Sequence, residues 1–127
     1  MNQTILLVED NPHDEALTLR ALRSIVPVPV VVTACDGFEA LDFIFGNGDY
    51  QGRESSTGPA IILLDLKLPR MGGLEVLRRI REDAAAKFIP VIIFTSPTQG
   101  QDILDAYTLG ANSYVSNRLI TASSVTH

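Results

Sequence analysis

The chain of 127 residues is poor in cysteine and in basic residues, and each shortage excludes a class of protein. Cys35 is the single cysteine, so no internal disulfide can form. This suits a reducing compartment, and we expect a small buried group here rather than a reactive thiol. The net charge of -5 argues against nucleic-acid binding, which needs clustered Lys and Arg. Arg78, Arg79 and Arg81 form the one basic cluster in the sequence, and we expect it on the solvent side of a helix.

Long apolar runs are also missing from the N-terminus. The opening MNQTILLVED has no basic region, and its apolar run, residues 5–8, is too short for a signal peptide or a membrane span. Apolar residues make up 46% of the chain and charged residues 20%, a balance typical of one globular domain. We therefore expect a cytoplasmic protein with a single core and no membrane partner.

What the chain does contain is a regular alternation of strand-like and helix-like segments. Apolar, β-branched runs predict strands at residues 4–8, 30–33, 60–64, 90–94 and 113–115. Helical spacing predicts helices at residues 12–25, 38–45 and 99–109 and one that opens at 72–73. We expect the helix at 38–45 to pack largely against the core, and residues 46–59 to form a long loop. The pattern indicates a doubly wound α/β domain with a five-stranded parallel sheet, whose most apolar strand, residues 60–64, is central.

Polar side chains follow the predicted strands where a ligand would bind, beyond their carboxyl ends. Glu9 and Asp10 follow the first strand, Asp65 follows the third, and Thr95 follows the fourth. Three carboxylates at one edge repel one another, and a hard cation such as Mg²⁺ removes that penalty. Asp65 is the best candidate nucleophile, because it stands alone after the most buried strand, and the Thr95 hydroxyl could bind an anion beside it.

Each acid also has a simpler explanation as a helix cap. Asp10 could cap the helix that begins at Pro12, for instance. Three acids and a hydroxyl at successive strand ends favour the metal and phosphoryl site.

The stretches ILLVED, IILLDLKLPRMGGLEVL, IPVIIFTS and GANSYVS together resemble the receiver domain of two-component response regulators, from about residue 4 to 116. The resemblance implies the flavodoxin-like receiver fold and a phosphoryl group received by Asp65 from a sensor histidine kinase. It also implies a Mg²⁺ site made by Glu9, Asp10, Asp65 and the backbone carbonyl of Lys67, with Asp10 a direct ligand and Glu9 acting through water.

Two further roles come from the same resemblance. Thr95 would bind the phosphoryl oxygen, and Tyr114 would be the aromatic residue that swings inward in response. The domain would catalyse only its own phosphorylation and dephosphorylation, so we do not expect an enzyme in the usual sense. The long loop and the SYVS stretch resemble the single-domain receivers that partner bacteriophytochromes.

The end of the chain departs from the family. Receivers carry a Lys followed by a Pro after the fifth strand, where this sequence has Asn117 and Arg118. We therefore divide the chain into a receiver domain, residues 1–116, and an atypical tail, residues 117–127, in place of the fifth helix. One inserted base near the Asn117 codon would restore Lys-Pro, so a frameshift is one hypothesis. The other is an evolved truncation, whose exposed face would be covered by a second copy in a homodimer.

Two functions therefore stay open. The first is a phosphoacceptor receiver. The second is a phosphorylation-impaired, receiver-like interaction module, favoured by the uncharged Asn117, which cannot form an ion pair with a phosphoryl group. A small Mg²⁺ phosphatase is disfavoured, because such enzymes carry a second acid where Lys67 stands.

Overall fold

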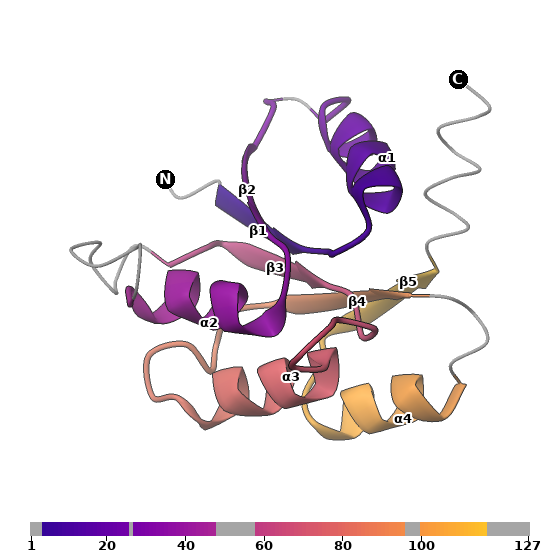
Figure 1. Cartoon of the computed structure of the whole chain (residues 1–127). Coiled ribbons are helices and arrows are strands. Elements are labelled where there is room, and N and C mark those ends of the chain that lie inside the picture. Colours follow the sequence, from indigo (N-terminus) through magenta and orange to yellow (C-terminus); the bar gives the residue numbers. More distant parts are fainter. Residues whose placement is uncertain (1–3, 26, 48–57, 96–99, 117–127) are drawn as a thin grey trace.

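The computed structural model describes residues 4–25, 27–47, 58–95 and 100–116 (Figure 1). Strands and helices alternate along these residues as the sequence predicts. Their bounds are β1 Thr4–Val8, α1 Pro12–Leu22, β2 Val30–Ala34, α2 Gly37–Phe45, β3 Ile61–Leu64, α3 Gly73–Glu82, β4 Val91–Thr95, α4 Gly100–Thr108 and β5 Ser113–Ser116.

The five strands form one parallel sheet in the order β2-β1-β3-β4-β5. The predicted fold class and the central position of the third strand are both confirmed. The chain passes from β1 outward to β2 and then returns to the other side of β1 to form β3. The order therefore reverses between β1 and β3, and in open parallel sheets this is where ligands bind.

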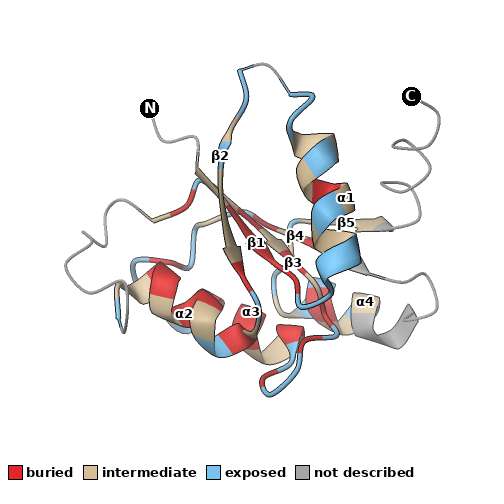
Figure 2. Cartoon of the chain, turned by 45° about the horizontal axis from the view of Figure 1, so that its top comes forward, coloured by how far each residue is buried: buried red, intermediate tan, exposed pale blue. Residues whose placement is uncertain are grey.

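Helices cover the sheet on both faces (Figure 1). α2, α3 and α4 lie on one face, and α1 lies on the other. The main core lies between the sheet and the three-helix layer, and it includes alternate strand residues and the apolar side of α3. Figure 2 shows buried residues on the strands and on α2 and α3. Leu6, Ile62 and Leu64 from the sheet and Val76 and Leu77 from α3 are fully buried there. Burying each such side chain contributes about 1.5–3 kcal/mol to stability. Packing in this layer therefore stabilises the position of β1 and β3 against α3.

α1 begins where Pro12 predicts and ends earlier than expected. Asn11 caps it, because the Asn11 side chain accepts hydrogen bonds from the backbone N–H groups of His13 and Asp14. The helix ends at Leu22, and the N–H groups of Ser24 and Ile25 bond three residues back rather than four. Ile25, predicted as the last residue of this helix, lies beyond its end and is 47% exposed, so that part of the prediction was wrong.

α2 is capped by Asp36, whose carboxylate accepts the Glu39 N–H at 2.8 Å. Leu41, Phe43 and Ile44 are buried against the sheet, as predicted. Phe38 is 44% exposed, although we expected it in the core. It lies in the first turn of α2, where the Arg70 guanidinium lies over its ring.

Cys35 is exposed rather than buried. It follows the last residue of β2, where the chain leaves the sheet, and its N–H donates to Glu39. Partial burial and the nearby Glu39 and Glu15 carboxylates raise the pKa of the thiol, so few of these thiols ionise at neutral pH.

The arginine cluster is only partly a solvated surface. Arg78 and Arg79 are exposed, as predicted, and they pair with acids of α3. Arg81 instead turns inward and donates to backbone carbonyls, including that of Ile89 at 2.8 Å and that of Gly110 at 2.9 Å. It therefore joins α3 to the segments that flank β4 and β5, a role that its position in a charged run did not reveal.

Three of the sequence predictions fall outside the described residues. They concern most of the loop at 46–59, the tail at 117–127 and the missing fifth helix. Among the helices that are described, none is both long enough and apolar enough to span a bilayer.

Candidate functional site

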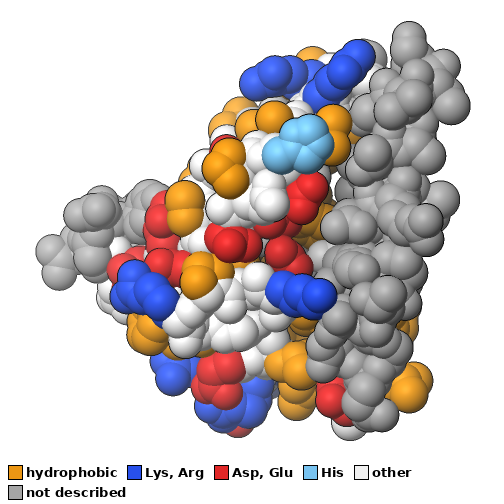
Figure 3. Space-filling view, turned by 45° about the vertical axis from the view of Figure 1, so that its right-hand side comes forward, with side chains coloured by type: hydrophobic (Ala, Val, Ile, Leu, Met, Phe, Trp, Pro, Cys, Tyr) orange, Lys and Arg blue, Asp and Glu red, His pale blue; other side chains and the backbone are white. Residues whose placement is uncertain are grey.

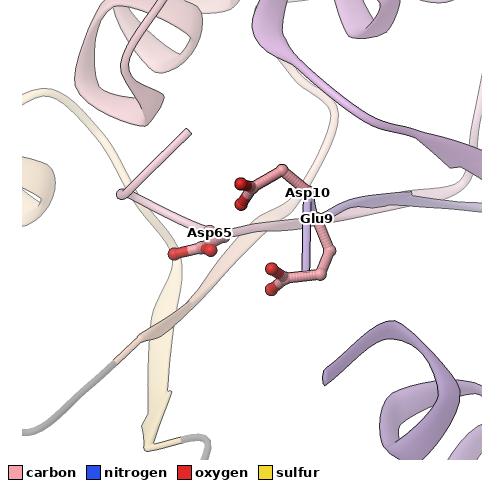
Figure 4. A group of neighbouring side chains, drawn as sticks. All are labelled: Glu9, Asp10 and Asp65. Carbon is pink, nitrogen blue, oxygen red and sulfur yellow. The ribbon is translucent and has the colours of Figure 1, made fainter. Parts of the chain in front are cut away.

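The three predicted acids meet at the point where the strand order reverses. β1 and β3 are adjacent and in register, with Val8 opposite Leu64 at their ends. The Asp65 N–H donates to the Val8 carbonyl at 3.1 Å, so Asp65 lies beside Glu9 and Asp10. One carboxylate oxygen from each of the three lies within 4.8 Å of the others. Figure 4 shows the Glu9 and Asp10 carboxylates both pointing to the side on which Asp65 lies.

Glu9 is the buried member of this group, with 2% of its surface exposed. Its side chain accepts the Asn11 N–H at 3.0 Å. Burial raises the pKa of Glu9 from 4.5 to about 8. The hydrogen bond from the Asn11 N–H lowers this pKa, and the neighbouring Asp65 carboxylate raises it. In the absence of a cation, Glu9 is therefore largely protonated at neutral pH.

Asp65 is half-buried at the base of the site. Its Oδ1 accepts the backbone N–H of Lys67 at 3.0 Å, which orients the carboxylate. Burial also raises the pKa of Asp65, while hydrogen bonds with the Lys67 N–H and with Glu9 act in the opposite direction.

Asp10 is the exposed member of the group. The alternative that Asp10 caps α1 is wrong, because Asn11 provides the cap. Figure 3 shows acidic side chains gathered on this face of the molecule. Asp10 is therefore held at the site by its place after β1 and not by a role in the helix.

The donor set fits a hard divalent cation. Three carboxylates share a small volume, and burial raises the pKa of two of them, Glu9 and Asp65. Oxygen ligands of this kind suit Mg²⁺, Mn²⁺ or Ca²⁺ rather than a soft metal. Glu9, Asp10 and Asp65 are the side chains that would hold the ion.

The remaining predicted residues are placed only in part. Lys67 is exposed in the loop after β3, two residues beyond Asp65. Thr95 ends β4, and its backbone pairs with Ser116 of β5, while Tyr114 pairs with Ile93. The side chains of Thr95 and Tyr114, and all of Asn117, lie outside the described part of the chain.

Sequence reasoning missed two residues that shape the site. Asn11 holds Glu9 through its N–H, and an Asn directly before a Pro is a recognisable cap signal. Arg70 pairs with Asp36 at 3.0 Å across 34 positions of sequence. No local pattern could have predicted that pair, because only the fold brings the two loops together.

The family model for the response regulator receiver domain matches residues 5–122. Response regulator Rcp1 of Synechocystis sp. is 35% identical over 113 residues, which cover 89% of this chain and 75% of Rcp1. A structure of the Mn²⁺-bound form of Rcp1 matches with a TM-score of 0.83 at 30% identity, covering 94% of this chain and 90% of that one.

Two further structures are similar over 99% of this chain and 91% of their own. Phosphorylated RcpA, a cyanobacterial phytochrome response regulator, matches with a TM-score of 0.85 at 34% identity. The bacteriophytochrome response regulator AtBRR matches with a TM-score of 0.83 at 40% identity. The chain therefore belongs to the response regulator receiver domain family of two-component signalling, and phytochrome response regulators are among its relatives.

Proposed function

We propose that this receiver domain accepts a phosphoryl group on Asp65 from a phosphohistidine of a sensor kinase, with Mg²⁺ as the cofactor. The observation that carries the proposal is the meeting of three carboxylates, from two adjacent strand ends, within 4.8 Å of one another. Similarity to a phosphorylated and to a Mn²⁺-bound response regulator supports both parts of the proposal.

Asp65 provides the attacking oxygen. One carboxylate oxygen forms a bond to phosphorus as the bond between phosphorus and the kinase imidazole nitrogen breaks, and the released imidazole takes up a proton. The Lys67 N–H holds the carboxylate in place through Oδ1 at 3.0 Å. The raised pKa of Asp65 makes its carboxylate a better nucleophile than an exposed one, provided that it is ionised.

Glu9 and Asp10 prepare the site for a cation. A bound divalent ion would neutralise the charge that develops on the phosphoryl oxygens. Asp10 would be a direct ligand, Glu9 would act through water, and the Lys67 carbonyl would complete the protein ligands. Because Glu9 is largely protonated without a cation, its proton must leave when the ion binds.

Thr95 and Tyr114 would report the phosphorylation to the β4–β5 edge of the sheet. Asn117 stands where the family has a Lys, so the phosphoryl group would lack an ion pair from this position. We therefore propose that Asp65 is still phosphorylated without this Lys, but that its phosphorylation has only a weak effect on Thr95 and Tyr114.

The kinase partner would be a phytochrome, because RcpA and AtBRR are phytochrome response regulators. A homodimer through the face that the fifth helix would cover is a further proposal, with residues 1–116 as the receiver and 117–127 as the tail. Transfer to its own Asp65 and hydrolysis of that product would be the reactions of the domain.

The test is incubation of the full chain with acetyl phosphate and Mg²⁺, read by phosphate-affinity electrophoresis. We expect a labelled species that disappears in Asp65→Asn and when the cation is chelated. Glu82→Gln, which removes a negative charge from the opposite end of α3, should label like the unchanged protein. Labelling that survives Asp65→Asn would contradict the proposal.

A second function, favoured by Asn117, is an interaction module that works without phosphate. The same Asp65→Asn variant separates the two. If that variant binds a phytochrome kinase as the unchanged protein does and still supports its output, the interaction module is the better description.

A further inference from the structure

Arg70 adopts a backbone conformation that an arginine rarely takes. Its φ is +68°, and it is the one residue other than glycine with a positive φ in the described part of the chain. The Met71 N–H bonds back to the Pro69 carbonyl at 2.7 Å, which closes a three-residue γ-turn around Arg70. The γ-turn with positive φ is strained, and such strain persists only where the surrounding structure holds it.

The side chain of Arg70 is held across the fold. Its guanidinium donates to the Asp36 carboxylate at 3.0 Å and lies over the Phe38 ring, 4.9 Å from the centroid. Asp36 also caps α2 through its other oxygen, which accepts the Glu39 N–H. The loop after β3 is thereby latched to the first turn of α2, although the Arg70 side chain itself is 65% exposed.

The latched loop is the one that orients the candidate phosphoacceptor. It starts at Asp65, and its Lys67 N–H donates to the Asp65 carboxylate. Leu68 and Met71, the residues that flank Pro69 and Arg70, are both buried. Six residues connect Asp65 to Arg70, so a change in the turn would move the Lys67 backbone relative to the carboxylates.

We propose that Arg70 is a positioning residue for the cation site: through its contacts with Asp36 and Phe38 it holds the β3–α3 loop so that Asp65 and Lys67 are arranged to bind the divalent ion. The inference rests on the proposed function of Asp65. It goes beyond that function in assigning a role to a side chain that touches neither the ion nor the phosphoryl group.

Charge alone predicts the opposite effect. Arg70 carries a positive charge, so its removal should strengthen the binding of a cation by simple Coulomb attraction. If Arg70 positions the loop, its removal should weaken that binding. The sign of the change therefore separates a geometric role from an electrostatic one.

The experiment is calorimetric titration of the metal-free full chain with Mg²⁺. We expect Arg70→Ala and Arg70→Gly to weaken binding by about threefold to tenfold, less than for a buried outer-shell partner because the pair is exposed. Gly adopts a positive φ without strain, so Arg70→Gly keeps the turn while losing the latch. Arg79→Ala, which removes an exposed arginine paired with Glu75, is the matched control and should bind as the unchanged protein does.

Two partner variants test the contact. Asp36→Asn keeps an oxygen that can cap α2 but loses its charge, and Arg70→Lys keeps the charge but not the planar group. We expect both to weaken Mg²⁺ binding less than Arg70→Gly does. The double variant, Arg70→Gly with Asp36→Asn, should bind no more weakly than Arg70→Gly alone.

Phosphorylation by acetyl phosphate gives a readout that general loss of stability would not produce. Arg70→Gly should need more Mg²⁺ for half-maximal rate, with the rate at saturating Mg²⁺ within twofold of that of the unchanged protein. Binding by Arg70→Gly that equals or exceeds that of the unchanged protein overturns the inference. Failure of the unchanged protein to bind Mg²⁺ or to label on Asp65 would instead overturn the proposed function.

Discussion

At the scale of single residues, burial and charge oppose each other in the candidate site. Glu9 is nearly inaccessible to solvent, and Asp10 beside it is exposed, although both follow the same strand. The alternation of side chains along an extended chain sends the two in different directions. One carboxylate is therefore protonated at neutral pH without a cation, while its neighbour stays accessible to an incoming ion.

The raised pKa of Glu9 predicts how stability depends on pH. The folded protein binds this proton up to about pH 8, whereas the unfolded chain releases it near pH 4.5. Between these values the folded state holds more protons, so the free energy of unfolding of the metal-free protein should fall as pH rises. Urea denaturation in a chelator at pH 5, 6, 7 and 8 measures the fall.

Glu9→Gln is the matched variant for this prediction, because it keeps the shape and loses the titration. We expect a shallower fall with pH, with a remainder from Asp65, whose pKa is also raised. Equal slopes in the two proteins would show that Glu9 titrates normally in the folded state.

At the scale of elements, the site depends on the close approach of α3 to the end of β3. A Cβ added at Gly73 would lie 2.4 Å from the Asp65 carbonyl oxygen and 2.7 Å from the Leu66 Cα. The Gly73 N–H also donates to the Leu66 carbonyl at 3.1 Å. The first turn of α3 therefore rests directly on the backbone that presents Asp65.

The adjacent glycines of the GG pair provide a matched test. Gly73→Ala should destabilise the protein by about 1–3 kcal/mol and weaken Mg²⁺ binding, because the added methyl group must displace the Asp65 backbone. Gly72→Ala should change stability by only about 0.5 kcal/mol, since nothing lies within 4 Å of its added Cβ. Urea denaturation and Mg²⁺ titration of both variants decide the matter, and equal effects would contradict this account.

At the scale of the whole molecule, the acids and the proposed switch lie on neighbouring strands of one sheet. β3 carries Asp65 at its end, and β4 and β5 carry Thr95 and Tyr114. A conformational change that begins at Asp65 would therefore pass from β3 to β4 and then from β4 to β5, the far edge of the sheet. Asn117, next in sequence after β5, lacks the charge that would connect that edge to the phosphoryl group.

Asn117→Lys should strengthen this connection. Charge-assisted hydrogen bonds are roughly twice as strong as neutral ones, so a Lys should increase the response of the β5 edge to phosphorylation. We expect a larger shift of the Tyr114 amide signal in NMR spectra after acetyl phosphate is added. Asn117→Gln is the uncharged control, and equal shifts in the two variants would argue against an ionic role for this position.

Much of the fold could be predicted from local pattern. Unbroken apolar runs such as residues 5–8 and 61–64 are typical of parallel strands buried on both faces, and their order along the chain restricts the topology. Errors arose at element ends. Ile25 lies beyond the last residue of α1 and Phe38 lies in the first turn of α2, and both are exposed although they belong to an apolar pattern. Cys35 was misjudged for the same reason, because it lies one residue beyond β2.

The α/β class, the parallel sheet and the identity of the three acids could be predicted from the sequence, because strand ends and residue types are local properties. The packed fold was needed to show that Glu9 is buried while Asp10 is exposed, and that Asn11 rather than Asp10 caps α1. It alone also paired Arg70 with Asp36 across 34 positions. Burial and long-range pairing depend on how layers pack, and packing is a property of the whole chain rather than of any segment.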